Sequence, residues 1–177
     1  TNRDVVGRFK DVTISFNDST EVKADVVGRT ADLDVALLAI KDKKNKNFKS
    51  LPMCIRKSPT VGEDIVVIGN PLGLSSTTTR GIISGVRNDD GYTMVQIDAP
   101  INPGNSGGPI VNYNSEVVGI VTSKKVGMGI EGIGFGIGIT SALESLGVQL
   151  EKEEKTSNWL TKLFNRGGKT ECQNTIS

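Results

Sequence analysis

The chain consists largely of short stretches in which apolar and polar residues alternate, separated by clusters of turn-forming residues. Val12, Ile14 and Phe16 alternate with small polar residues, which is the period of a strand with one buried face. A second alternating stretch at 22–26 follows the turn-forming cluster at 17–20, so the two stretches predict a β-hairpin. Further strand-like stretches cover residues 33–40, 65–69, 79–86, 92–97, 109–112 and 116–122. Many short strands with few helices predict an all-β fold, either a barrel or a sandwich.

Helical patterns occur only toward the end of the sequence. Residues 141–146 predict one short helix, and a second is predicted from about Ser157, a good N-cap residue, to the glycine pair at 167–168. The apolar residues of this second helix fall on one side: Trp159, Leu160, Leu163 and Phe164. We interpret this stripe as a surface that packs against the folded domain, with docking to a partner or a membrane surface as the alternative.

The charge balance and the missing histidine narrow the function classes. The 177 residues include 21 basic and 20 acidic side chains, whereas a general nucleic-acid binder is normally more basic. The chain has no histidine, so it lacks the commonest metal ligand and the commonest general base near neutral pH. Two cysteines, Cys54 and Cys172, are too few for a disulfide framework or a four-cysteine zinc site, and they look free. We therefore expect no bound metal, no cofactor and no nucleic-acid partner.

The strongest local signal is the sequence NPGNSGGP at residues 102–109, where glycines flank a serine on both sides. Glycines permit unusual backbone angles, so this turn can expose the Ser106 hydroxyl as a nucleophile. The same turn can direct the N–H groups of Gly104 and Ser106 at one point, which would form an oxyanion hole. The alternative interpretation is a glycine-rich hairpin with an incidental serine.

Together with its surroundings, this segment resembles the trypsin-like serine peptidases, and among them the HtrA/Deg family. The sequence DAPINPGNSGGP at 98–109 is similar to the nucleophile segment of that family. The sequences VGEDIVVIGNPLG at 61–73, GIIS at 81–84 and IGFGI at 133–137 are similar to other segments of the family. The resemblance covers about residues 1–147 in one continuous order. It implies a trypsin-like fold of two β-barrels with the active site between them.

The resemblance also implies a domain organisation. It places a trypsin-like peptidase domain at 1–150, with an N-terminal barrel at about 1–50 and a C-terminal barrel at about 60–140. Residues 151–177 then form a C-terminal tail that contains the short amphipathic helix. This tail is too short for another globular domain, so we expect none of the peptide-binding PDZ domains that relatives carry.

Candidate site residues follow from the positions that match the family. Ser106 corresponds to the nucleophile, and the segment Gly104, Asn105 and Ser106 corresponds to the oxyanion hole. Asp34, in the sequence LDVAL, corresponds to the acid that orients the catalytic base. Asp32 is a local rival, but the family's acid directly precedes the Val-Ala-Leu run. Without the resemblance, Asp34 would be interpreted as a charge at a strand edge that faces water.

The base of the catalytic triad is replaced. The family pattern at the start of the chain is Thr-Asn-x-His-Val-Val, and the sequence TNRDVV places Asp4 at the histidine position. An aspartate side chain is shorter than imidazole, and its ordinary pKa of about 3.9 makes it a weak base at neutral pH. We therefore expect a serine endopeptidase fold that hydrolyses peptides very poorly or not at all. The alternative is a pseudoprotease that binds peptides or unfolded protein segments without cleaving them.

The resemblance further implies an apolar pocket for a substrate side chain beside the nucleophile. Ile101 and the segment Ile133, Gly134 and Phe135 would form its walls, so we expect small or medium aliphatic side chains to bind there. The alternative for Ile133 and Phe135 is ordinary barrel core. The partner on this interpretation is a polypeptide substrate or an unfolded protein segment.

The N-terminal barrel is expected to be truncated, because the family's first strands precede the histidine segment. Such a barrel has an open edge, whose unpaired backbone groups invite pairing with another chain. Self-association or strand donation at this edge is one outcome, and a distorted barrel or a fragment of a longer chain are the others. The compartment stays open, although relatives are often periplasmic or otherwise exported.

Overall fold

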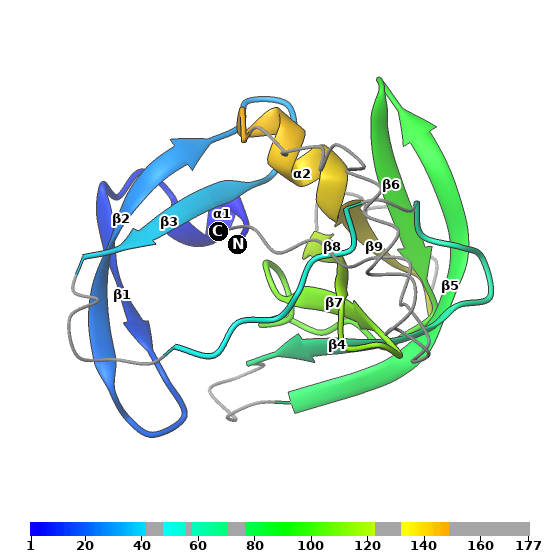
Figure 1. The fold of residues 1–177 in the computed structure, drawn as a ribbon, viewed down its shortest axis with the longest axis horizontal. Helices are drawn as coiled ribbons and strands as arrows, with labels where there is room; N and C mark the ends of the chain where they lie inside the picture. Colours follow the sequence, from blue (N-terminus) through cyan, green and yellow to red (C-terminus); the bar gives the residue numbers. More distant parts are fainter. Residues whose placement is uncertain (42–47, 56–57, 71–76, 123–131, 149–177) are drawn as a thin grey trace, which may run out of the picture.

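A computed structural model describes residues 1–41, 48–55, 58–70, 77–122 and 132–148 of the chain. The elements in these residues are α1 (Arg3–Val6), β1 (Asp11–Ser15), β2 (Glu21–Arg29), β3 (Ala36–Ile40), β4 (Asp64–Gly69), β5 (Thr77–Asp89), β6 (Tyr92–Ile97), β7 (Pro109–Asn112), β8 (Val117–Thr122), β9 (Gly134–Gly138) and α2 (Ile139–Ser145). The strands make a three-stranded sheet in the order β1-β2-β3 and a closed barrel in the order β4-β5-β6-β9-β8-β7. The sheet and the barrel lie side by side, and the chain begins between them (Figure 1). No helix among these residues is long and apolar enough to cross a membrane.

The N-terminal sheet is the predicted hairpin extended by a third strand. β1 and β2 pair antiparallel with Ile14 opposite Val22, and β2 pairs with β3 across a register shift between Val26 and Gly28. Strand β2 buries Val22 and Ala24, as the alternation in the sequence predicted. Within the described residues β1 and β3 each pair on one side only. This part of the fold is therefore an open sheet, in agreement with the expected truncated barrel.

The C-terminal barrel contains the main hydrophobic core. Each of its six strands is hydrogen-bonded to a neighbour on both sides, so the barrel leaves no strand edge exposed. Its interior is filled by almost fully buried branched side chains: Ile65, Val67, Ile83, Val95, Ile97, Ile110, Val118 and Val121. Helix α2 packs against β8 and β9. The prediction of an all-β, trypsin-like barrel fold with short C-terminal helical structure is confirmed.

A buried polar pair closes the hairpin between β7 and β8. The Asn112 side-chain oxygen accepts hydrogen bonds from the backbone N–H groups of Asn114 and Glu116, both at 3.0 Å. The Asn112 side-chain amide donates a third bond to the Glu116 carboxylate, also at 3.0 Å. Both side chains are buried. Because a carboxylate removed from water needs hydrogen-bond donors, Asn112 makes the burial of Glu116 tolerable.

Asn112→Ala is expected to lower the free energy of unfolding by about 2 kcal/mol, because it removes a donor to a buried carboxylate and an acceptor for two N–H groups. Urea denaturation followed by circular dichroism measures this change. Tyr113→Ala, at the exposed tip of the same hairpin, is the matched control and should stay within about 0.5 kcal/mol of the unchanged chain. Equal, small effects of both substitutions would show that the pair does not stabilise the barrel.

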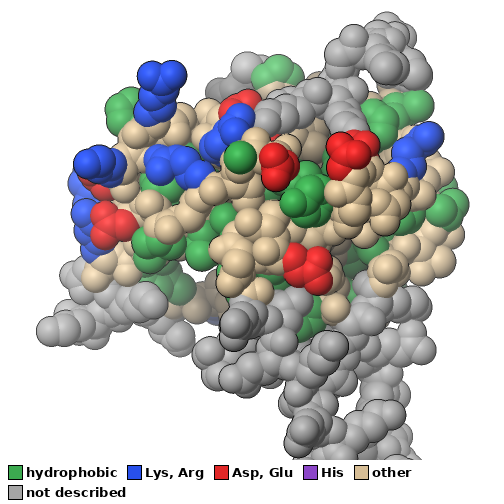
Figure 2. All heavy atoms as spheres, turned by 90° about the horizontal axis from the view of Figure 1, so that it is seen from above, with side chains coloured by type: hydrophobic (Ala, Val, Ile, Leu, Met, Phe, Trp, Pro, Cys, Tyr) green, Lys and Arg blue, Asp and Glu red, His purple; other side chains and the backbone are tan. Residues whose placement is uncertain are grey.

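Charged side chains of both signs lie on the three-stranded sheet. Lys and Arg side chains gather over the sheet at the left of Figure 2. On the same sheet, Lys41 Nζ lies 2.8 Å from Asp25 Oδ1, and the hydrogen bond to Asp25 raises the pKa of Lys41.

Several sequence expectations change once the structure is considered. Residues Arg3–Val6 form a short helix that the sequence pattern did not predict. Helix α2 begins at Ile139, two residues before the predicted helix. Cys54 forms a disulfide, which corrects the expectation of a free thiol. Cys54 has no other cysteine near it in the sequence, so no spacing pattern indicated a disulfide. The helix predicted from Ser157 to 167–168 lies outside the described residues.

Candidate active site

Asp34 lies just before β3, in a loop that Thr30 holds in shape. The Thr30 hydroxyl accepts a hydrogen bond from the Val35 N–H at 3.2 Å and donates one to the Leu33 carbonyl. The loop buries Asp34, which is 2% exposed, and leaves Asp32 exposed. Because a buried carboxylate is costly unless its environment supports it, the burial favours Asp34 over Asp32 as the functional acid. It also removes the alternative of a strand-edge charge that faces water.

Only one oxygen of the Asp34 carboxylate has a partner. Oδ1 accepts a hydrogen bond from the backbone N–H of Asp4 at 3.0 Å. Oδ2 is buried and has no hydrogen-bond partner among the described residues. A buried carboxylate oxygen is stabilised by a hydrogen-bond donor, and Oδ2 has room in its hydrogen bonding for one. In a Ser-His-Asp triad, the acid accepts its catalytic hydrogen bond from the imidazole N–H.

The Asp4 side chain points to solvent. It is 61% exposed, and its Oδ1 lies 3.4 Å from the Arg3 guanidinium. The guanidinium is itself anchored, because it donates to the backbone carbonyls of Thr30 and Ala31 at 3.3 and 3.2 Å. Helix α1 therefore delivers the backbone N–H of Asp4 to Asp34, while the carboxylate of Asp4 forms a surface ion pair.

Ser106 lies on a tight turn that is pressed against the end of β4. A Cβ at Gly108 would lie 2.2 Å from the carbonyl oxygen of Ile68, and a Cβ at Gly69 would lie 2.2 Å from Asn105 Oδ1. Neither position has room for a side chain. The two glycines thus let the turn approach the barrel closely, and the Asn105 side chain is buried in the contact.

The backbone N–H groups of this turn fall into two kinds. The N–H of Asn105 donates to the carbonyl of Asn102 at 3.0 Å and stabilises the turn. The N–H groups of Gly104 and Ser106 donate to no acceptor among the described residues. Gly104 has a φ of 104°, which only glycine adopts easily. Two free N–H groups on either side of a bonded one are suited to an oxyanion hole, in which Asn105 contributes shape rather than a donor.

The sheet and the barrel meet at the first two residues of the chain. On the sheet side, Ala36 donates its N–H to the Thr1 carbonyl at 2.9 Å, and the Asn2 side-chain amide donates to the Asp34 carbonyl at 2.7 Å. On the barrel side, a Cβ at Gly107 would lie 2.6 Å from Thr1 Oγ1 and 2.8 Å from the Asn2 nitrogen. Burial lowers the pKa of the Thr1 α-amino group, and the negative charge of Asp34 opposes that shift. These two residues therefore join the predicted acid to the turn that carries the predicted nucleophile.

Of the four predicted pocket residues, the structure brings Gly134 against Ile101. A Cβ at Gly134 would lie 2.5 Å from Ile101 Cγ1, so glycine at this place leaves room for the isoleucine. Ile101, Ile133 and Phe135 are all partly exposed, whereas Gly134 is buried. Ile101 packs against the barrel core, so the pocket formed by these residues stays a prediction.

Sequence reasoning missed the polar residues that support the site. Asn2, Arg3 and Thr30 hold the loop that presents Asp34, and Asn2 is 1% exposed. A buried asparagine next to a charged residue leaves no trace in hydrophobic periodicity. The one available signal is that Asn2 belongs to the short family pattern in which Asp4 was found.

A closed barrel, an adjoining open sheet and a buried aspartate joined to a glycine-flanked serine define the trypsin-like class of serine peptidase domains. Residues 1–120 match the trypsin-like peptidase domain family. The chain belongs to this family.

The similar proteins are serine proteases of the HtrA type. The chain is 41% identical over 167 residues to a serine protease HtrA-like of Staphylococcus haemolyticus (strain JCSC1435), covering 86% of this chain and 26% of that protein. It is 36% identical over 167 residues to a probable periplasmic serine endoprotease DegP-like of Pseudomonas putida (strain W619), covering 90% of this chain and 34% of that one. A solved structure of the HtrA-type protease AlgW with a decapeptide has a TM-score of 0.72 and 34% identity, covering 83% of this chain and 46% of that chain. The chain thus spans about a quarter to a third of the length of these curated relatives.

Proposed function

We propose that this domain is an HtrA-type serine endopeptidase domain whose cleavage activity is strongly impaired and which binds polypeptide segments where the sheet meets the barrel. In this proposal Ser106 is the nucleophile and Asp34 the orienting acid. The N–H groups of Gly104 and Ser106 form the oxyanion hole. Asp4 occupies the position of the missing base.

The observation that carries the proposal is the unpartnered Oδ2 atom of Asp34. This carboxylate would hold a base in place, and the chain contains no histidine to be held. The Asp4 carboxylate has no N–H to offer Oδ2, and it is paired with Arg3 at the surface. In this proposal the carboxylate that would orient a base is therefore present, whereas the base that would accept the proton of Ser106 is absent.

The chemistry that remains follows from this arrangement. When the Ser106 hydroxyl attacks a peptide carbonyl carbon, its proton must pass to an acceptor, and solvent water is a poor one at neutral pH. The free N–H groups of Gly104 and Ser106 still stabilise the negative charge that develops on the carbonyl oxygen. In a well-studied serine protease, loss of the base lowers turnover by about 10⁶, and the residual rate comes from such groups and from binding.

Polypeptide binding without cleavage is expected for reduced, carboxymethylated casein labelled with a fluorophore. Fluorescence anisotropy should show binding, and gel electrophoresis should show intact casein after long incubation. Ile101→Asp should weaken binding at least about tenfold, because it places a charge in the apolar pocket wall, a loss of about 1.4 kcal/mol. Tyr113→Asp, at an exposed turn of the barrel, is the matched control and should bind like the unchanged chain.

Two outcomes of this experiment would contradict the proposal. Absence of binding would contradict the proposed polypeptide partner. Rapid fragmentation of casein would contradict the proposed loss of cleavage activity. Binding with no cleavage even in a variant that regains a base would instead favour the second candidate, a pseudoprotease that only holds peptides or unfolded segments. The AlgW structure solved with a decapeptide is the observation that favours peptide binding in either case.

The open sheet supports a further partner in this proposal. β1 and β3 each have one unpaired side within the described residues, and unpaired strand edges pair readily with another strand. A strand of a second copy, or a strand that a longer chain would supply, fits this edge.

A further inference from the structure

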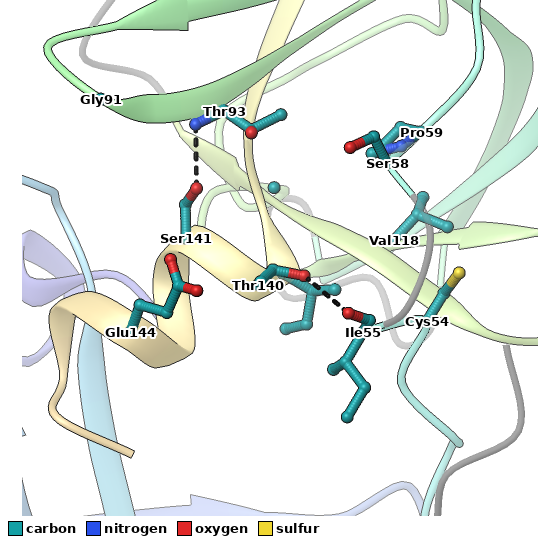
Figure 3. Close-up of a pocket in the computed structure, with 12 residues that line it drawn as sticks. Cys54, Ile55, Ser58, Pro59, Gly91, Thr93, Val118, Thr140, Ser141 and Glu144 are labelled. Atoms are coloured by element: carbon teal, nitrogen blue, oxygen red, sulfur yellow. Dashed lines mark hydrogen bonds between the residues drawn. The ribbon is translucent and has the colours of Figure 1, made fainter. Parts of the chain in front are cut away.

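The part of the molecule that the proposed function leaves unexplained is a cavity beside α2. It has a volume of about 190 Å³. Its lining comes from the segment that leads into the barrel, from β6 and from α2, as Figure 3 shows for Cys54, Thr93 and Ser141. Ser141 Oγ accepts a hydrogen bond from the Thr93 N–H at 2.9 Å, and Thr140 Oγ1 donates to the Ile55 carbonyl at 3.4 Å. The walls of the cavity are therefore fixed by hydrogen bonds.

The lining of the cavity includes a disulfide-bonded cysteine, Cys54. Cys54 is 4% exposed and forms a disulfide, and its N–H donates to the Val117 carbonyl at 2.9 Å. The sequence has two cysteines, and the second is Cys172, which lies outside the described residues. The Cα atoms of two disulfide-bonded cysteines lie about 6 Å apart. The residues next to the partner cysteine must therefore lie against the surface around Cys54.

The described chain also leaves the barrel close to this cavity. The Val148 N–H donates to the Leu143 carbonyl at 3.0 Å. The Val148 side chain packs against a buried cluster of Val117, Ile139 and Leu143, and Met53 and Ile55, the two neighbours of Cys54, pack against the same cluster. Residues 149–177 therefore begin beside the neighbours of Cys54, and a Cys54–Cys172 bond would bring Cys172 back to the same place. The chain between Val148 and Cys172 is long enough to make this return.

We propose that Cys172 is the disulfide partner of Cys54 and that this bond docks the C-terminal segment 149–177 over the cavity beside α2. The occupant of the cavity mouth is this segment of the same chain. The segment contains Trp159 and the apolar stripe that the sequence analysis found without an assigned partner. Docking is therefore sensitive to thiol reductants. This proposal does not depend on the proposed function.

Alkylation of the full chain tests the disulfide. The protein is purified without reductant, unfolded, treated with N-ethylmaleimide and weighed by intact mass spectrometry. We expect no adduct before reduction and one adduct on each cysteine after reduction with dithiothreitol. In that reduction dithiothreitol closes to its cyclic disulfide, and both cysteine sulfurs gain a proton. Adducts on both cysteines without reduction, or a disulfide-linked dimer on a non-reducing gel, would overturn the proposal.

Tryptophan fluorescence tests the docking, because Trp159 is the only tryptophan in the chain. Acrylamide should quench it at least about twofold more strongly in Cys172→Ser, or in the reduced chain, than in the oxidised chain. Ser58→Phe fills the cavity and leaves both cysteines in place, so it should also increase quenching, whereas Asn114→Phe in the β7–β8 turn should not. If quenching stays the same upon reduction, the segment is tethered but not docked and the proposal fails. If Cys172→Ser folds poorly, reduction of the unchanged chain still decides.

Discussion

Replacing Asp4 by histidine is expected to increase peptide hydrolysis at least about a thousandfold. Loss of the base in a well-studied serine protease lowers turnover by about 10⁶, so restoring it can recover a large part of that factor. Asp34 already accepts the N–H of residue 4, and its Oδ2 is an unused acceptor for an imidazole N–H. The free N–H groups of Gly104 and Ser106 need no change. One substitution therefore supplies the one missing group.

The measurement is kcat/KM on a fluorogenic casein, together with the rate at which a fluorophosphonate labels Ser106. Asp4→Asn is the matched control, because it changes the charge without adding a base, and it should stay as inactive as the unchanged chain. Asp4→His combined with Ser106→Ala should lose both hydrolysis and labelling. Equal activity of the unchanged chain and Asp4→His would show that residue 4 does not hold the base position.

Gly108→Ala is expected to lower the free energy of unfolding by about 3 kcal/mol or more. Its Cβ would lie 2.2 Å from the Ile68 carbonyl oxygen and 2.9 Å from the Asn105 carbonyl oxygen. Both atoms belong to the backbone, so neither can turn aside as the end of a flexible side chain could. The clash must push the nucleophile turn away from β4, and we expect peptide binding to weaken as well.

Urea denaturation of Gly108→Ala measures the loss, and Gly85→Ala is its matched control. Gly85 also lies in the barrel, but the nearest atom to an added Cβ there is 3.5 Å away, an ordinary contact. Its substitution should change the free energy of unfolding by less than about 1 kcal/mol. If Gly108→Ala is as stable as Gly85→Ala, the close approach of the turn to β4 is not a constraint on the fold.

The sequence predicted the strands well and the contacts poorly. Alternation of apolar and polar residues located the β1–β2 hairpin, because burial of one face imposes a period of two. Short strand-like runs bounded by turn residues located most barrel strands. The roles assigned to Ser106 and Asp4 rest on short motifs and stay predictions. The contacts that bring Asp34, Asn2 and the nucleophile turn together join residues far apart in the chain, and no local pattern encodes them.

Two further features show why local patterns fail. The exposed direction of the Asp4 side chain results from the pairing of Arg3 with the loop at 30–31, a contact between distant segments. The disulfide of Cys54 likewise has no signal in the spacing of the cysteines. Both are properties of the assembled fold.

The contrast between the closed barrel and the open sheet has a consequence for local stability. Opening a closed barrel breaks pairing on both sides of a strand, whereas β1 or β3 can detach from the sheet by losing one neighbour in the described structure. The sheet is thus the region whose amide hydrogens should exchange first with solvent. Because Asp34 lies just before β3 and Ser106 lies beside the barrel, detachment of β3 would separate the predicted acid from the predicted nucleophile while the barrel stays folded. A low concentration of denaturant should therefore disrupt the candidate active site before it unfolds the barrel.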